Sequence, residues 1–255
     1  MKTFFEFSNK QENVTALYVY GEIIPGSNKW DESDVTFKDF QQATENIKDN
    51  STLEMYISSP GGSVFTTQSM ISMLERCKEK KNIKIVAYVD GLAASCASWL
   101  IMVADEIVIY SNSMLMIHKP MTMAWGNANE LQKEIDLLNK LENDIMMPMY
   151  MNKAKNITEE ELKDLINAET WMAADEIKEK FNVTYIEEEK KVAAKLEKDS
   201  INKYKNVPES VKELFNSLKE PEEEEEKEDD KPTMSVATKS LIDRINSKSK
   251  LWETY

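Results

Sequence analysis

Short apolar runs alternate with stretches of helical character along the first half of the chain, and this order constrains the fold more than any other feature. The runs are rich in β-branched and aromatic residues, which is typical of buried strands. Paired in order, strand first, they are 16–25 with 36–49, 53–57 with 64–80, and 83–89 with 95–104. Strands that alternate with helices predict an α/β domain with a largely parallel sheet.

One strand-to-helix turn carries a serine among small residues. Ser95 follows the predicted strand 83–89, and Gly91, Ala93 and Ala94 leave space around it. Small neighbours allow a hydroxyl to project from a tight turn, with a backbone N–H and a helix N-terminus facing the group that it attacks. A small-residue junction without chemistry is the alternative interpretation, because such turns are common in α/β proteins.

Two further turns supply groups that could act with Ser95. Gly61 and Gly62 follow a predicted strand, and glycines there allow positive φ angles that aim free N–H groups at a ligand oxygen. His118 ends the apolar run 114–117 and is the only histidine in the chain, so it is the one candidate for acid–base chemistry by an imidazole. A plain turn and a structural histidine are the alternatives. In a parallel sheet, sites form where such strand ends meet.

Three segments resemble the signature motifs of the Clp protease proteolytic subunit. They are Ser58-Ser59-Pro60-Gly61-Gly62, Gly91-Leu92-Ala93-Ala94-Ser95 and Met116-Ile117-His118-Lys119-Pro120. The resemblance extends from about Leu17 to about Ile186 and is strongest to the Clp-related head maturation (prohead) proteases of tailed phages. It implies a spiral of ββα units, as in the crotonase-like superfamily, and a serine peptidase with a Ser-His-acid triad.

The resemblance also implies a role for each residue of the site. Ser95 matches the nucleophile, His118 matches the general base, and the backbone N–H groups of Gly62 and Cys96 match the oxyanion hole. Glu169 falls where the bacterial subunits have an aspartate, as it does in similar phage enzymes, and a carboxylate there holds the imidazole tautomer. Because glutamate is one methylene longer, its backbone must stand further back. No cofactor and no metal are expected.

The expected function is that of a serine endopeptidase, specifically a phage head maturation protease that cleaves capsid or scaffold protein. A housekeeping Clp-type subunit is the alternative. It would need a separate AAA+ unfoldase, because the chain contains no Gly-x-x-x-x-Gly-Lys-Ser/Thr phosphate-binding motif. An acyl-thioester enzyme of the crotonase type would use the same fold without a nucleophilic serine. Lys119 leaves a Ser–Lys dyad open, and a non-catalytic assembly or scaffolding protein is the remaining alternative.

The net charge and the cysteine content indicate which binding partners and which cellular location to expect. A net charge of −14 argues against nonspecific binding to nucleic acid. The two cysteines, Cys77 and Cys96, suggest no disulfide framework, which fits a reducing cytoplasm. No apolar run approaches the roughly 18 residues of a membrane span, and the N-terminus lacks the apolar core of a signal peptide. We expect a cytoplasmic location, in the host cytoplasm or the procapsid if a phage encodes the protein.

A long helix is predicted after His118. Asn127 and Glu130 form a capping-box pattern, and apolar residues then recur at spacings of three and four. These residues are Leu131, Ile135, Leu138, Leu141 and Ile145. The stripe indicates one buried helix face. The resemblance implies that this is the handle helix, which packs two rings of subunits together, and it therefore implies a ring-shaped homo-oligomer.

The composition of the chain changes near Glu187. We expect a peptidase domain over 1–190 and a charged, flexible tail over 191–255. Within this tail, 219–231 holds nine acidic residues and three lysines, a composition that is typical of disorder. Beyond it, 235–255 carries apolar residues that suggest a C-terminal helix, with a frayed end as the alternative.

Overall fold

The structure is a computed structural model that describes residues 7–11, 13–26, 35–188, 201–209 and 211–213. The chain divides into two compact units, Met1–Leu218 and Lys219–Tyr255. The second unit lies outside the described residues, and so do the predicted acidic linker and C-terminal helix within it. The first unit reaches beyond the predicted domain boundary at residue 190, because residues 201–213 pack against the domain.

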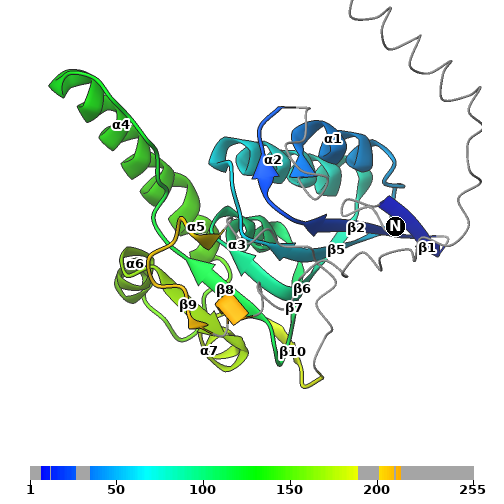
Figure 1. The fold of residues 1–255 in the computed structure, drawn as a ribbon. Helices are drawn as coiled ribbons and strands as arrows, with labels where there is room; N and C mark the ends of the chain where they lie inside the picture. The colour runs from blue at the N-terminus through cyan, green and yellow to red at the C-terminus, as the bar shows by residue number, and fades with distance from the viewer. Residues whose placement is uncertain (1–6, 12, 27–34, 189–200, 210, 214–255) are drawn as a thin grey trace, which may run out of the picture. The chain divides into compact units, whose positions relative to one another are not determined.

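An eight-stranded sheet forms the centre of the first unit (Figure 1). Its strands are β1 Phe7–Gln11, β2 Val14–Tyr20, β5 Thr52–Ser59, β6 Lys84–Ala94, β7 Glu106–Tyr110, β8 Met114–Ile117, β9 Thr170–Ala173 and β10 Thr184–Ile186. The strands β2, β5, β6, β7 and β10 run parallel in that order, and β1 is antiparallel to β2. This arrangement confirms the predicted α/β class with a mostly parallel sheet.

The long strand β6 connects the sheet to its C-terminal part. Residues Val86–Val89 of β6 pair with β7, whereas Leu92–Ala94 pair with β8. The strand β8 also pairs antiparallel with β9, where Ile117 lies opposite Thr170. The C-terminal ends of β6 and β8 and the start of β9 are therefore brought to one place by backbone hydrogen bonding alone.

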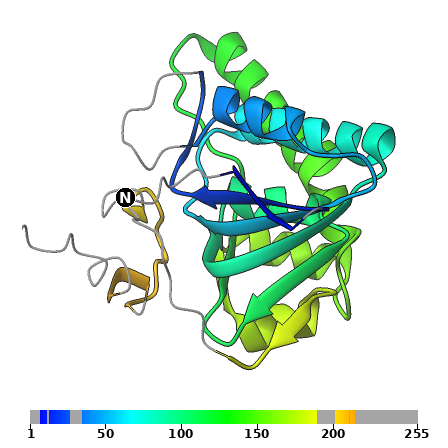
Figure 2. The ribbon, with the colours of Figure 1, turned by 90° about the vertical axis from the view of Figure 1, so that its right-hand side faces the viewer.

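Seven α-helices lie in the described part of the chain. They are α1 Phe37–Glu45, α2 Val64–Lys81, α3 Cys96–Leu100, α4 Ala128–Lys140, α5 Met147–Met151, α6 Glu159–Asn167 and α7 Ala174–Lys180. The helices α1 and α2 pack against each other along one side of the sheet (Figure 2). Thr36 begins α1 with a capping box, and the Ser63 side chain accepts a hydrogen bond from the Thr66 amide at the start of α2.

Several strands and helices begin or end at other residues than predicted, mainly because of how the strands pair. The run 16–25 is not one strand, because Gly21 at φ 127° ends β2 at Tyr20 and a short strand β3, Ile23–Ile24, pairs instead with β4, Val35–Thr36. The strand predicted over 83–89 continues to Ala94, because its last residues pair with β8. The strand β9 was not predicted at all. The helix predicted over 95–104 is α3 followed by one 3₁₀ turn, Ile101–Val103.

The helix α4 begins at the predicted capping box of Asn127 and Glu130. It projects away from the rest of the fold (Figure 1), and none of its residues is buried. The prediction that its apolar stripe is a buried face is therefore wrong within the single chain, where Ile135 is 50% exposed. Only where the chain continues into a π-helix, Leu141–Met146, does the stripe reach the core.

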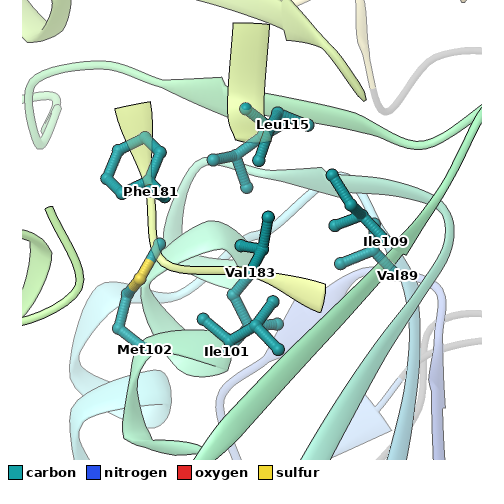
Figure 3. Close-up of a pocket in the computed structure, with 9 residues that line it drawn as sticks. Val89, Ile101, Met102, Ile109, Leu115, Phe181 and Val183 are labelled. Carbon is teal, nitrogen blue, oxygen red and sulfur yellow. The ribbon is translucent and has the colours of Figure 1, made fainter. Parts of the chain in front are cut away.

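A cavity in the core lies between the sheet and the chain around α7 (Figure 3), and Ser95 does not line it. Its lining is wholly apolar and consists of Val89, Ile101, Met102, Ile107, Ile109, Leu115, Ile177, Phe181 and Val183. Because no polar side chain faces it, we assign this cavity to imperfect packing and not to chemistry.

Candidate active site

Ser95 lies at the turn between β6 and α3 with an unusual backbone. Its φ of 54° and ψ of −129° belong to a region that residues with a Cβ rarely adopt and that costs of order 1–3 kcal/mol. The turn is held in place because the Ser95 amide donates a hydrogen bond to the Met116 carbonyl of β8, at 2.9 Å. Such a strained strand-to-helix turn is the geometry that presents a nucleophilic hydroxyl beside a helix N-terminus.

His118 meets Ser95 across the two paired strand ends. Because Ala94 of β6 pairs with Met116 of β8, the residues that follow each strand are neighbours. The distance between Ser95 Oγ and His118 Nε2 is 2.7 Å, which is a hydrogen bond. His118 is 8% exposed, and burial lowers the pKa of its imidazole; the nearby Glu169 carboxylate raises this pKa and the Lys203 ammonium lowers it.

Glu169 lies beside His118 but does not bond to it. Since Ile117 pairs with Thr170 in the antiparallel β8–β9 ladder, the next pair along would be His118 and Glu169. Glu169 has a positive φ of 52°, and its Oε1 accepts the backbone N–H groups of Lys205 and Asn206, each at 2.7 Å. Across the described residues, no hydrogen bond joins Glu169 to His118.

The two glycines of the first motif lie where neighbouring segments leave no room for a side chain. A Cβ on Gly61 would stand 2.8 Å from the Ser95 Cβ and 3.1 Å from the Cys96 amide nitrogen. A Cβ on Gly62 would stand 2.1 Å from the Ile23 carbonyl oxygen. Only glycine fits either position, and both have positive φ angles. Without a side chain, Gly61 leaves room next to the backbone nitrogen of Cys96, at the start of α3.

A profile of the family described as Clp protease matches residues 22–188, well over half of the chain. The chain belongs to the Clp protease family. Members of the Clp protease family are serine peptidases that typically form oligomeric rings and act on polypeptide substrates. None of the curated proteins compared with the sequence matches it.

A small apolar pocket opens beside Ser95 in this Clp-family chain. Its lining comes from α2, the Ser95 turn, α3, the loop after β8 and the helical segment after α4. It consists of Val64, Ser95, Cys96, Trp99, Pro120, Leu141 and Met146. The pocket therefore surrounds the serine with apolar side chains. The Cys96 thiol is no rival nucleophile, because burial raises its pKa to about 11.

Sequence reasoning missed the residues that cover the site. Tyr204 is 6% exposed, and its ring centroid lies 5.2 Å from that of His118. Lys203, its neighbour, forms an ion pair with Glu22 at 2.6 Å. The segment around them is rich in charge and has only weak apolar periodicity, so its periodicity did not indicate a packed position. A tyrosine within such a charged stretch was the one available signal.

The described ranges contain neither a cluster of metal-binding side chains nor a helix that could span a membrane. Within them, no group of three or more His, Cys, Asp or Glu side chains is placed to hold a metal ion. None of the helices described is long and apolar enough to cross a bilayer.

Proposed function

We propose that this chain is a serine endopeptidase with Ser95 as nucleophile, His118 as general base and Glu169 as the third triad member. The 2.7 Å hydrogen bond between Ser95 Oγ and His118 Nε2 is the observation that carries the proposal. The Clp protease family supplies the class of reaction, which is hydrolysis of peptide bonds in polypeptides. We extend the proposal to the family's spiral of ββα units.

The proposed reaction begins when Ser95 Oγ attacks the scissile carbonyl carbon and His118 Nε2 takes the hydroxyl proton. His118 then protonates the leaving amine, which leaves an acyl group on Ser95; water, deprotonated by the same imidazole, releases that group. The N–H groups of Gly62 and Cys96 would stabilise the oxyanion, a contribution of about 3 kcal/mol for each donor. Glu169 would stabilise the imidazolium that forms in each step.

Two enzymatic alternatives lose support from the site's contacts. A Ser–Lys dyad would need Lys119 at the serine, but the Lys119 ammonium pairs with the buried carboxylate of Glu142 at 3.2 Å. An acyl-thioester enzyme of the crotonase type does not use a serine nucleophile, so it does not account for the hydrogen bond between Ser95 and His118. A non-catalytic assembly protein does not account for the strained backbone of Ser95, because such strain is typical of functional sites.

A serine-directed fluorophosphonate tests the proposal directly. The purified chain should be labelled on Ser95, as located by mass spectrometry of its peptides, and should hydrolyse an unfolded polypeptide. Labelling confined to other serines, with no hydrolysis, would remove the peptidase assignment.

For the biological role, we propose head maturation in a tailed phage, with capsid or scaffold protein as the substrate. The support is the likeness of the three motifs to prohead proteases. Such an enzyme acts within the procapsid and needs no AAA+ unfoldase, whereas a housekeeping subunit in the cytoplasm would require one. The neighbouring genes decide between the two roles: portal and major capsid genes beside this one would favour maturation, and an adjacent unfoldase gene would favour housekeeping proteolysis.

The acid limb of the pH profile should move in opposite directions in two variants. Hydrolysis needs neutral His118, and burial lowers the pKa of this imidazole, so activity should persist below the ordinary histidine pKa of about 6.5. Glu169→Gln removes a charge that raises this pKa and should move the limb to lower pH; Lys203→Ala removes a charge that lowers it and should move the limb to higher pH. Measurements of kcat/KM from about pH 4 to 9 check both signs.

Glu169→Gln should also slow the reaction by on the order of 10³- to 10⁴-fold while leaving residual turnover, because the oxyanion hole and substrate binding survive. If the variant matches the unmodified enzyme while a change at Asp175 abolishes turnover, the third triad member is Asp175 instead.

We further propose a ring-shaped homo-oligomer held partly by α4. On this helix the residues Leu131, Ile135 and Leu137 are exposed, at 38%, 50% and 38%, and the helix projects away from its own subunit. Apolar side chains exposed along a projecting helix indicate a contact with another subunit, and Clp-family chains typically form rings.

Ile135→Asp should therefore disperse the rings and lower activity, although the substitution is remote from Ser95. Asn129→Asp adds the same charge on the opposite side of α4 and should leave the assembly intact. Light scattering measures the particle mass of both variants. A fully active, unmodified protein at the 29.4 kDa monomer mass would contradict the ring.

A further inference from the structure

Residues 201–209, which we call the strap, pack onto the surface that surrounds Ser95 and His118. Ile201 and Tyr204 are buried, at 4% and 6% exposure, although the sequence around them is charged. They form an apolar cluster with Leu92, Ala94 and Met116, whose strands β6 and β8 end at the candidate active site. The strap therefore packs against the motifs that contain Ser95 and His118.

Tyr204 lies at the centre of this contact. Its hydroxyl donates a hydrogen bond to the Pro60 carbonyl of the first motif, at 2.5 Å. Its ring lies edge-on to the rings of His118 and Trp171, with centroid distances of 5.2 and 6.0 Å. Burial raises the pKa of the Tyr204 hydroxyl, and the nearby Ser95 side chain lowers this pKa in part. One side chain thus contacts the base and the first motif, and lies close to the nucleophile.

Polar contacts fix the strap on both sides of Tyr204. On one side, Lys203 forms its ion pair with Glu22 at 2.6 Å. On the other side, the backbone N–H groups of Lys205 and Asn206 each donate to Glu169 Oε1 at 2.7 Å. The side-chain amide of Asn206 donates to the Ala168 carbonyl at 2.9 Å. The carboxylate proposed to orient His118 is therefore engaged by the strap.

We propose that the strap is a built-in inhibitor that occupies the place of the polypeptide substrate and engages the triad carboxylate until it is displaced. This inference rests on the proposed peptidase function. A substrate must reach Ser95 Oγ, and Tyr204 packs against His118, the base beside that atom. Most of the polar contacts of the strap are at exposed positions, where competition with water makes each worth little, so the strap can leave without unfolding the domain.

The experiment compares the rate of fluorophosphonate labelling at Ser95 in Tyr204→Ala, in Tyr185→Ala and in the unmodified chain, at pH 8 where His118 is neutral. Tyr185 lies in β10, against Lys178, and does not belong to the strap or the site. Tyr204→Ala should be labelled at least about tenfold faster, which corresponds to a strap that is docked more than about 90% of the time. Tyr185→Ala should be labelled at the unmodified rate.

A peptide of sequence INKYKNVPE, added in trans, supplies a second measurement. It should slow the labelling of Tyr204→Ala in proportion to its concentration, and the same peptide with alanine in place of tyrosine should not. If Tyr204→Ala does not fold, as judged by circular dichroism, Tyr204→Phe takes its place. It keeps the ring and loses the hydroxyl that donates to the Pro60 carbonyl, and it should also be labelled faster than the unmodified chain.

The outcomes separate the two proposals. Equal labelling of Tyr204→Ala and the unmodified chain would overturn the strap and leave the peptidase standing. Slower labelling of a folded Tyr204→Ala would also overturn it, because Tyr204 would then support the site instead of blocking it. Absence of Ser95 labelling in every form would overturn the peptidase proposal itself.

Discussion

Ser95→Ala is expected to lower peptide hydrolysis by on the order of 10⁵- to 10⁶-fold and to abolish labelling by the fluorophosphonate. The reason is that the Ser95 hydroxyl is the atom hydrogen-bonded to His118 at 2.7 Å, and an alanine offers neither a nucleophile nor a proton to the base. The residual rate over the uncatalysed reaction would come from the oxyanion hole and from substrate binding. Rates are measured with an unfolded polypeptide under single-turnover conditions.

The matched control for this substitution is Ser69→Ala. Ser69 is an exposed serine on α2 whose hydroxyl bonds only to the Phe65 carbonyl of its own helix. The Ser69→Ala variant should keep full activity. Both variants should unfold at the temperature of the unmodified chain, because the Met116 contact that holds the Ser95 turn is made by a backbone amide. Normal hydrolysis by folded Ser95→Ala would show that another residue is the nucleophile.

His118→Ala is expected to lower hydrolysis by a similar factor, on the order of 10⁵-fold or more. No second histidine exists in the chain to take over the proton, and the Ser95 hydroxyl by itself is a weak nucleophile at neutral pH. The acid limb that belongs to the imidazole should disappear from the pH profile of whatever rate remains.

Added imidazole gives His118→Ala its own positive control. The substitution removes a ring that is 8% exposed, and the space left beside Ser95 can admit a free imidazole. Imidazole should raise the rate of His118→Ala and leave that of Ser95→Ala unchanged. A variant that keeps the unmodified pH profile would remove His118 from the mechanism.

The sequence by itself determined the α/β class and the family, and it pointed to the turns that carry the proposed site. Each of these features can be recognised within a short stretch of sequence. Gly62 is required by the close approach of the Ile23 carbonyl, and the small residues before Ser95 fit the end of β6. The capping box of Asn127 and Glu130 began α4 where the pattern predicted it, because its hydrogen bonds span only three residues.

Only the tertiary structure decided what surrounds that site. β6 extends to Ala94 because β8, which lies later in the sequence, pairs with it, and no propensity within 83–94 reports that partner. The apolar stripe of α4 predicted burial, yet a stripe does not say whether its cover comes from the same chain.

Tyr204 lies 86 positions after His118 and reaches it through contacts between segments that are distant in the chain. A charged segment without strong periodicity carries no local signal of such docking, because its burial depends on the shape of a surface built by other residues. The packing at Tyr204 is therefore a property of the folded domain and not of the strap's own sequence.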